Sequence, residues 1–291
     1  MKKFILALAT AAVLTAAPFA RADIAAEARA AAQKQLDTYA KGDFKTIFEG
    51  LPASYKKDIS NLTLKFAQII DPEVYNTVNA LLVEFLEVAI GKSELIAGMS
   101  ARNTKISTPV TSPLGVEFNA EDTKDLLTAL KNCVAMLTLD TLKKGDVRAI
   151  LASGEFTALG KLYAKHLADD ISKTKITKVE DFGNNIFLVH TSVDRYGGQS
   201  AFYMCKVGKE WLPGHVSSTR WQSVKNGSRD LDSFKISAKT KAMILDNAKV
   251  VQKNFDKLRA AKTETQVQEW MRETFLMILF IGMESFETDD E

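Results

Sequence analysis

The sequence is poor in the residues that most often carry chemistry: its 291 residues include three histidines and two cysteines. It contains no Gly-x-Ser-x-Gly, His-Glu-x-x-His or Cys-x-x-Cys motif, which excludes the usual signatures of serine hydrolases, zinc proteases and dithiol redox sites. Basic residues are not interleaved with aromatic residues, so the electrostatic pattern of nucleic-acid binding is missing as well. The sequence therefore predicts no cofactor and no nucleic-acid partner, and it does not name an activity.

Long apolar runs are rare outside the first 22 residues. Residues 1–22 combine a basic start, an apolar stretch and the small-residue end Ala-Arg-Ala, which is typical of a secretory signal peptide. We expect cleavage before Asp23. No cysteine lies directly after the predicted cleavage site, so a lipoprotein anchor is not predicted, and the mature protein is expected to be periplasmic or secreted. The alternative is a retained N-terminal anchor helix.

Net charge of one sign is also lacking. Three of the 38 basic residues and none of the 36 acidic residues lie in the signal segment, so the remainder has 35 basic and 36 acidic residues.

The apolar run Phe275–Met283 is much shorter than the ~20 residues that span a bilayer, so no spanning segment is predicted after signal removal. Residues 264–283 predict either a homodimer contact or a helix buried in the protein.

The two cysteines permit one disulfide in an oxidising compartment. Cys133 lies on a predicted helix and Cys205 on a predicted strand, so a bridge would join the helical part to the sheet. Two buried free thiols are the alternative, because cysteine is among the most buried residue types.

The segment LDTYAKGDFKTIFEG, residues 36–50, recurs as LDTLKKGDVRAILAS, residues 139–153, with seven identical positions at one offset. In each copy a glycine that can end a helix precedes an aspartate that can cap the next one. The pattern predicts such a break at Gly42 and again at Gly145. Duplication of this unit and convergence on one capping solution are both open interpretations.

Apolar residues at helical spacing predict a helical region over residues 23–171, and Asp71 followed by Pro72 is a clear helix start. Near residue 172 the apolar period changes from 3.6 to 2. Glycine-containing turns then separate segments rich in β-branched and aromatic residues, which predicts a four-stranded antiparallel meander over residues 172–222.

Helical spacing resumes in the last part of the chain and predicts C-terminal helices over residues 237–284. The predicted fold class is therefore α+β: a large helical region, a four-stranded meander, and final helices that pack on the sheet or on the bundle. Residues 23–284 are expected to form one compact unit.

Two segments resemble NTF2-like exported bacterial proteins. AQKQLDTYAKGDFKTIFEGLPASYKKD, residues 32–58, is similar to their opening helix, Gly-Asp break and second helix, and FYMCKVGKEWLPGHV, residues 202–216, is similar to their closing hairpin. The resemblance implies helices on one face of a curved antiparallel sheet and a concave face that forms a pocket. The layout is also similar to uncharacterised secreted proteins of similar length. Neither resemblance implies an activity or assigns a residue.

Polar residues gather at one end of the predicted second strand. Alternation places His190 and Asp194 on one face and residues such as Val189 on the other, and His215 on a neighbouring predicted strand could face His190. With Tyr203, these groups could serve proton transfer. The alternative is the solvent face of an ordinary sheet. A zinc site would need three convergent ligands, and no metal is predicted.

Two classes of function remain as hypotheses. The leading one is an exported, non-enzymatic protein that binds a small ligand or another envelope protein, with Tyr203 and Trp211 as ligand contacts. The alternative is a pocket enzyme, a hydrolase or isomerase, built on His190, Asp194 and His215. Trp211 and Trp221 are also predicted as core residues, with Trp221 at the end of the last strand.

The predicted signal peptide can be tested directly. If the chain is expressed in a bacterium with its first 22 residues, mass spectrometry of the periplasmic or secreted fraction should find Asp23 as the N-terminal residue. Protein that keeps Met1 and sediments with the membranes would contradict the prediction.

Overall fold

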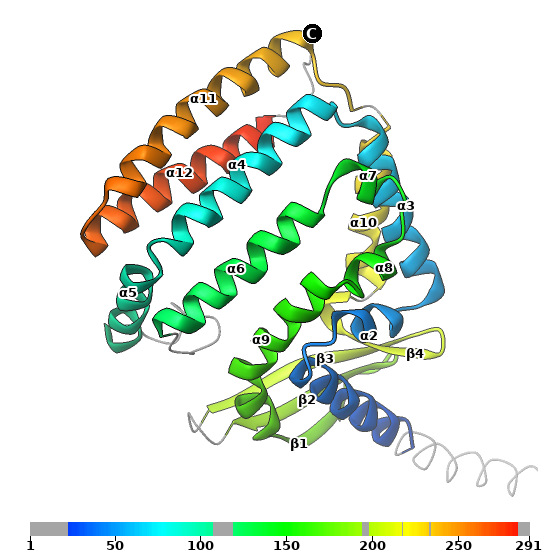
Figure 1. The fold of residues 1–291 in the computed structure, drawn as a ribbon. Coiled ribbons are helices and arrows are strands. Elements are labelled where there is room, and N and C mark those ends of the chain that lie inside the picture. Colours follow the sequence, from blue (N-terminus) through cyan, green and yellow to red (C-terminus); the bar gives the residue numbers. More distant parts are fainter. Residues whose placement is uncertain (1–22, 107–118, 194–197, 217, 233, 285–291) are drawn as a thin grey trace, which may run out of the picture.

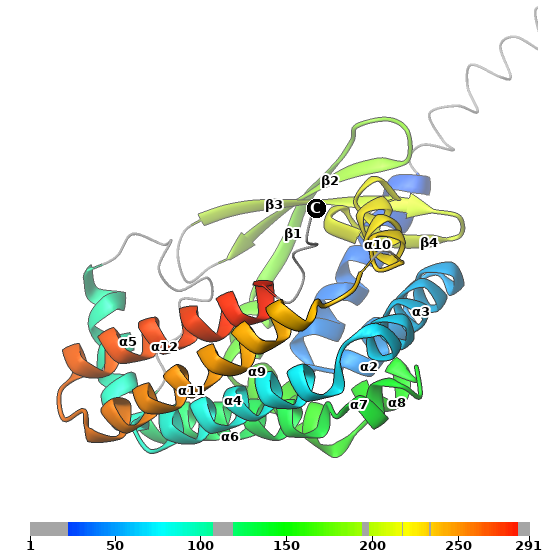
Figure 2. The same ribbon diagram turned by 90° about the horizontal axis from the view of Figure 1, so that it is seen from above.

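The computed structural model describes residues 23–106, 119–193, 198–216, 218–232 and 234–284. It shows helices before and after one antiparallel sheet (Figures 1 and 2), so the predicted α+β class is confirmed. The helices before the sheet are an unlabelled N-terminal helix over residues 23–40, α2 (Phe44–Glu49), α3 (Ala53–Ile69), α4 (Pro72–Ile90), α5 (Ser93–Ile106), α6 (Ala120–Met136), α7 (Leu139–Leu142), α8 (Val147–Leu151) and α9 (Gly154–Ser172). A short 3-10 helix, η1 (Gly214–Val216), then α10 (Ser218–Asp230), α11 (Ala238–Ala260) and α12 (Glu264–Glu284) follow it.

The sheet is a meander whose strands pair in chain order. Its strands are β1 (Thr174–Asp181), β2 (Ile186–Val193), β3 (Gly198–Val207) and β4 (Glu210–Pro213). The predicted alternation on β2 is confirmed, because Phe187, Val189 and Thr191 are buried on one face. The N-terminal helix covers this face, where Ala32 packs against Val189 and Met204.

The largest core lies in the helical part. Helices α4, α11 and α12 pack against one another, and α6 joins α4 to α9 (Figure 1). The core is made of large apolar side chains from the three helices, including Leu81, Phe85, Val251, Phe255 and Ile278. Helix α4 begins as predicted: Pro72 is its first residue, and Asp71 accepts hydrogen bonds from two backbone N–H groups. None of the described helices has the length and apolarity needed to cross a membrane.

The fourth strand is shorter than the sequence predicts, so the boundary at residue 222 is wrong. β4 stops at Pro213, and Trp221 lies on α10 instead of ending a strand. The Trp221 ring stacks on Tyr55 of α3, with ring centroids 3.9 Å apart, and its Nε1 donates a hydrogen bond to Asp58 at 2.9 Å. These contacts join α10 to a helix that is distant in sequence, and the local pattern of residues does not contain them.

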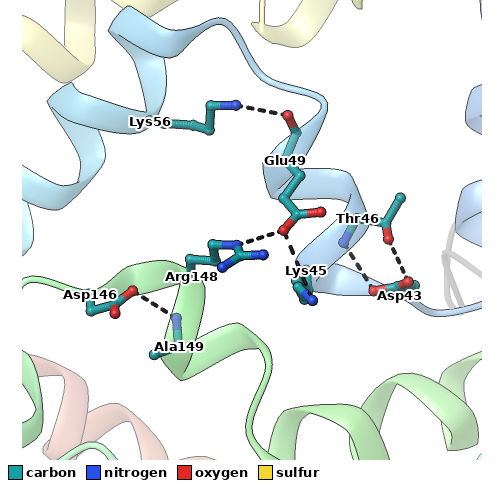
Figure 3. A network of polar contacts seen from close by, with 8 residues as sticks. All are labelled: Asp43, Lys45, Thr46, Glu49, Lys56, Asp146, Arg148 and Ala149. Atoms are coloured by element: carbon teal, nitrogen blue, oxygen red, sulfur yellow. Dashed lines mark hydrogen bonds and ion pairs between the residues drawn. The ribbon is translucent and has the colours of Figure 1, made fainter.

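Both copies of the repeated Lys-Gly-Asp segment have the same backbone conformation. Gly42 and Gly145 have φ values of 61° and 65°. Asp43 and Asp146 have nearly equal φ and ψ values, −88° and 83° against −89° and 76°. Each aspartate accepts a hydrogen bond from the backbone N–H three residues later (Figure 3). The predicted breaks and caps are confirmed.

The two copies also contact each other. Helix α2 of the first copy lies beside α8 of the second, and Arg148 Nε donates to Glu49 Oε1 at 2.6 Å (Figure 3). Lys45 occupies the position in the first copy that Arg148 occupies in the second, and its Nζ lies 4.0 Å from the same carboxylate. The two equivalent cations therefore share one acidic partner.

Each glycine break packs against the long helix that follows the other copy. Gly42 touches Gly160 of α9 so closely that a Cβ on either glycine would lie within 2 Å of the other's carbonyl oxygen. Gly145 lies beside Leu64 of α3, where a Cβ would meet its nearest atom at 3.5 Å. The two copies therefore exchange packing partners, although the contact at Gly42 is much closer than the one at Gly145.

Gly42→Ala and Gly145→Ala form a matched pair of substitutions. Both place a methyl group on a left-handed backbone, which costs about 1–2 kcal/mol. Only the Gly42 methyl would also overlap Gly160, and we expect that overlap to cost roughly 2 kcal/mol more. Urea denaturation of the two variants measures the difference. Equal losses in the free energy of unfolding would contradict the contact between the two glycines.

Candidate functional site

A pocket of about 570 Å³ lies between the N-terminal helix, β3 and the end of β4, and we call it the helix-strand pocket. One wall is a single face of the helix, made of Ala32, Gln35, Leu36 and Tyr39. The remaining lining residues come from the sheet and the turn after it: Ile186, Phe202, Tyr203, Cys205, Pro213 and Gly214. Its volume falls within the roughly 300–1,000 Å³ typical of ligand sites.

The shortness of β4 creates the space. β4 pairs with only the last four residues of β3, and Pro213 ends it because proline has no backbone N–H for a further ladder bond. The chain then turns at Gly214, where a Cβ would lie 2.8 Å from the Cβ of Tyr203. Glycine therefore lets the turn pass close to β3, and the pocket opens beyond it.

The lining of the helix-strand pocket is uncharged. No acidic, basic or histidine side chain is among the described residues that line it. Its polar groups are few: Gln35 Nε2 donates a hydrogen bond to the Tyr39 hydroxyl at 3.1 Å, and Tyr203 is 46% exposed. Burial raises the pKa of the Cys205 thiol, which keeps it protonated and weakly nucleophilic. An ionised group would lose hydration here without gaining a charged partner.

Polar contacts hold the first turns of the N-terminal helix on the sheet. Lys206 of β3 pairs with Glu27 at 2.7 Å, and Arg29 donates to the backbone oxygen of Ile176 at 2.5 Å. The hydrogen bond from Lys206 lowers the pKa of Glu27. The Lys206 ammonium also lies 5.3 Å from the centre of the Trp211 ring. These contacts fix the start of the helix, and the apolar contacts of Ala32 fix its middle.

The two predicted ligand contacts lie at two adjacent pockets. Tyr203 lines the helix-strand pocket. The rings of Tyr203 and Phe182 pack edge-to-face. Trp211 lines a second pocket of about 550 Å³, between the N-terminal helix, α2 and β4. Trp211 also packs edge-to-face on Phe187, consistent with its predicted place in the core. Gln35, Tyr39 and Pro213 line both pockets.

His190 lies on the face of β2 opposite the N-terminal helix. Its Nε2 is 3.2 Å from Glu180, which is also paired with Lys178 on the neighbouring strand. The hydrogen bonds from Lys178 and His190 lower the pKa of Glu180. His190 lines neither of the two pockets.

The other members of the predicted catalytic set are placed differently. His215 is in η1 because β4 has already ended, so the prediction that it lies on a strand is wrong. Asp194 lies outside the described residues. Within the part of the chain that the structure describes, no group of three or more histidine, cysteine, aspartate or glutamate side chains could hold a metal ion.

The disulfide that the sequence left open is not formed. Cys133 on α6 and Cys205 on β3 are both free and buried. Burial and the charge of Glu155 on α9 raise the pKa of Cys133, whereas Cys205 lies near Tyr55 of α3. The two thiols thus lie on different elements of the fold and have different neighbours.

The last helix packs against the bundle and keeps part of its apolar surface exposed. Ile278 is buried in the helical core, and Phe275 packs on Phe85. Phe275 and Leu276 are nevertheless 43% and 44% exposed. The helix is therefore partly buried against the bundle. The homodimer through residues 264–283 stays a prediction.

Sequence reasoning missed the helix wall as part of a site. The spacing of Ala32, Leu36 and Tyr39 places them on one face of a helix, but the spacing does not say what this face covers. Phe202 carried no signal of its own, because aromatic residues are ordinary on strands.

Comparisons with family models, with curated proteins and with solved structures returned no match. The resemblance to NTF2-like proteins therefore stays a prediction.

The state of the thiols predicts a simple titration. In the native protein both cysteines should react slowly with a thiol reagent, because they are buried and protonated. After unfolding in guanidinium without reductant, both should react. A chain that shows no reactive thiol after unfolding would contain the bridge and would contradict the described structure.

Proposed function

We propose that the protein is a binding protein that holds an uncharged, largely apolar chemical group in the helix-strand pocket. The observation that carries the proposal is the lining: apolar walls, a small set of polar groups, and no charge among the described lining residues. Ligand sites usually combine such walls with a few polar groups that fix orientation. The hydrogen-bonded pair Gln35 and Tyr39 supplies those groups on the helix side.

The chemistry of the pocket favours binding over catalysis. A general acid and base need two titratable groups poised near the working pH and within reach of the same atom. Cys205 is the potential nucleophile of the lining, and its raised pKa works against that role. His190, which was the candidate base, is engaged by Glu180 on the other face of the sheet.

The proposal includes export. Residues 1–22 have the pattern of a signal peptide, and every lining residue of the pocket follows them in the chain. Removal of the predicted signal would therefore leave the pocket complete. A periplasmic or secreted binding protein fits both features.

Binding of a neutral apolar dye tests the proposal. Titration with N-phenyl-1-naphthylamine should give a saturable rise in fluorescence with one site per chain. Tyr203→Ala should weaken binding about tenfold, which corresponds to a loss of roughly 1.4 kcal/mol of aromatic contact. The dye should also slow the labelling of Cys205 in the native protein without affecting Cys133, as measured by peptide mass spectrometry.

Two variants control this experiment. Met243 on α11 is 43% exposed, close to the value for Tyr203, but lies on a distant helix, so Met243→Ala should leave dye affinity unchanged. His190→Ala should also leave it unchanged, because His190 does not line the pocket. Absence of saturable binding, or equal effects of Tyr203→Ala and Met243→Ala, would count against the proposal.

A further inference from the structure

Strand β3 has an unpaired edge next to the helix-strand pocket. β3 has ten residues and β4 has four, and β4 pairs only with the segment from Met204 to Val207. The first six residues of β3 therefore have a paired neighbour on one side only among the described strands. Gly214 lies against Tyr203, so the open part of the edge is centred on Ala201.

The direction of the backbone groups on this edge follows from one hydrogen bond. Lys206 N donates to the backbone oxygen of Asn185, which precedes β2, at 3.0 Å. Backbone groups alternate in direction along an antiparallel strand, so those of even-numbered β3 residues point toward β2 and those of odd-numbered residues point away. The N–H and C=O of Ala201 therefore point outward, along the line that β4 would have followed.

The two edges of the sheet differ in their protection. β1, the other edge strand, exposes Lys175 and Lys178 and has a register irregularity between Ile176 and Lys178. Charged side chains and bulges are common devices that prevent an edge from pairing with another chain. The open segment of β3, Gly-Gln-Ser-Ala-Phe-Tyr, carries no charge. This edge lacks the devices that the β1 edge has.

We propose that the pocket receives an extended peptide segment of another protein, which adds a strand to β3 beside Ala201. The inference rests on the proposed function, since it names the class of molecule that brings the apolar group. A residue opposite Phe202 would share its face of the sheet, which is the face covered by the N-terminal helix. Its side chain would enter the helix-strand pocket beside Leu36 and Tyr39. Backbone bonds would supply affinity, and the pocket would select an uncharged apolar side chain.

A second copy of the chain could pair with only part of this edge. Symmetric pairing of two β3 strands centred on Ala201 would place Gly198 opposite Met204 of the other copy. The outer side of the strand at Met204 already belongs to β4, and Gly214 lies against Tyr203. A separate extended segment has no β4 or η1 of its own, so it meets these obstacles on one side of the new pair only.

The test uses four end-capped, fluorescein-labelled octapeptides in which threonine alternates with phenylalanine, leucine, lysine or glutamate. Fluorescence anisotropy should show that the phenylalanine or leucine peptide binds at least tenfold more tightly than the two charged peptides. The phenylalanine or leucine peptide with N-methylated backbone amides keeps its side chains but loses its backbone N–H donors. Its affinity should fall at least tenfold.

Two variants at one position provide the matched control on the protein side. Ala201→Pro removes the outward N–H, and proline is tolerated on edge strands where that group faces solvent. It should reduce peptide affinity at least tenfold, whereas Ala201→Val, which keeps the N–H, should change it less than threefold. Circular dichroism checks that both variants fold. If Ala201→Pro does not fold, the N-methylated peptide still decides the question on the natural protein.

The outcomes separate the inference from the proposed function. If the dye binds and none of the peptides does, the pocket binds ligands and the peptide inference is wrong. If neither N-methylation of the peptide nor Ala201→Pro lowers the peptide affinity, the inference of strand addition is wrong. Concentration-dependent self-association that Ala201→Pro abolishes would assign the edge to a second copy and would also overturn the inference.

Discussion

The docking of the N-terminal helix on one face of the sheet is the contact on which the pocket depends. Ala32, Val189 and Met204 are each completely buried at its centre. Full burial of a large apolar side chain contributes on the order of 1.5–3 kcal/mol, far more than the exposed ion pair at the start of the helix can add. Without this contact the two walls of the pocket would have no fixed distance between them.

The repeated Lys-Gly-Asp segment secures the other end of that helix. Gly42 ends the helix in a left-handed conformation and touches Gly160 of α9, so the chain leaves the sheet at a fixed point. The position of Tyr39, one turn earlier, follows from it. The second copy provides the same break between α7 and α8, where it meets α3. The repeat thus has a structural role in both places, whichever origin it has.

The sequence predicted the features that depend on local physics. The change of period near residue 172, the alternation around Val189, the Asp71-Pro72 helix start and the two aspartate caps all depend on residues within a few positions of each other. Local chemistry alone determines these features, and the structure agrees with each of them.

The features that the sequence did not predict depend on contacts between distant segments. Trp221 lies on a helix and stacks on Tyr55, more than 160 positions earlier, a contact that the local pattern does not contain. The pocket combines the helix over residues 23–40 with strands from the second half of the chain, and no local sequence motif marks either wall. The exchange of neighbours between the two glycine breaks is likewise a property of the packed chain, not of either segment.

The separation in sequence between the two walls of the pocket has a consequence for biosynthesis. Tyr39 is made roughly 160 residues before Phe202, which corresponds to about 10–30 s at ordinary rates of translation. During that interval the apolar face of the first helix has no sheet to cover. The nascent chain therefore exposes this face until β3 emerges. The pocket is complete once Gly214 has been made, before α11 and α12 can complete the helical core.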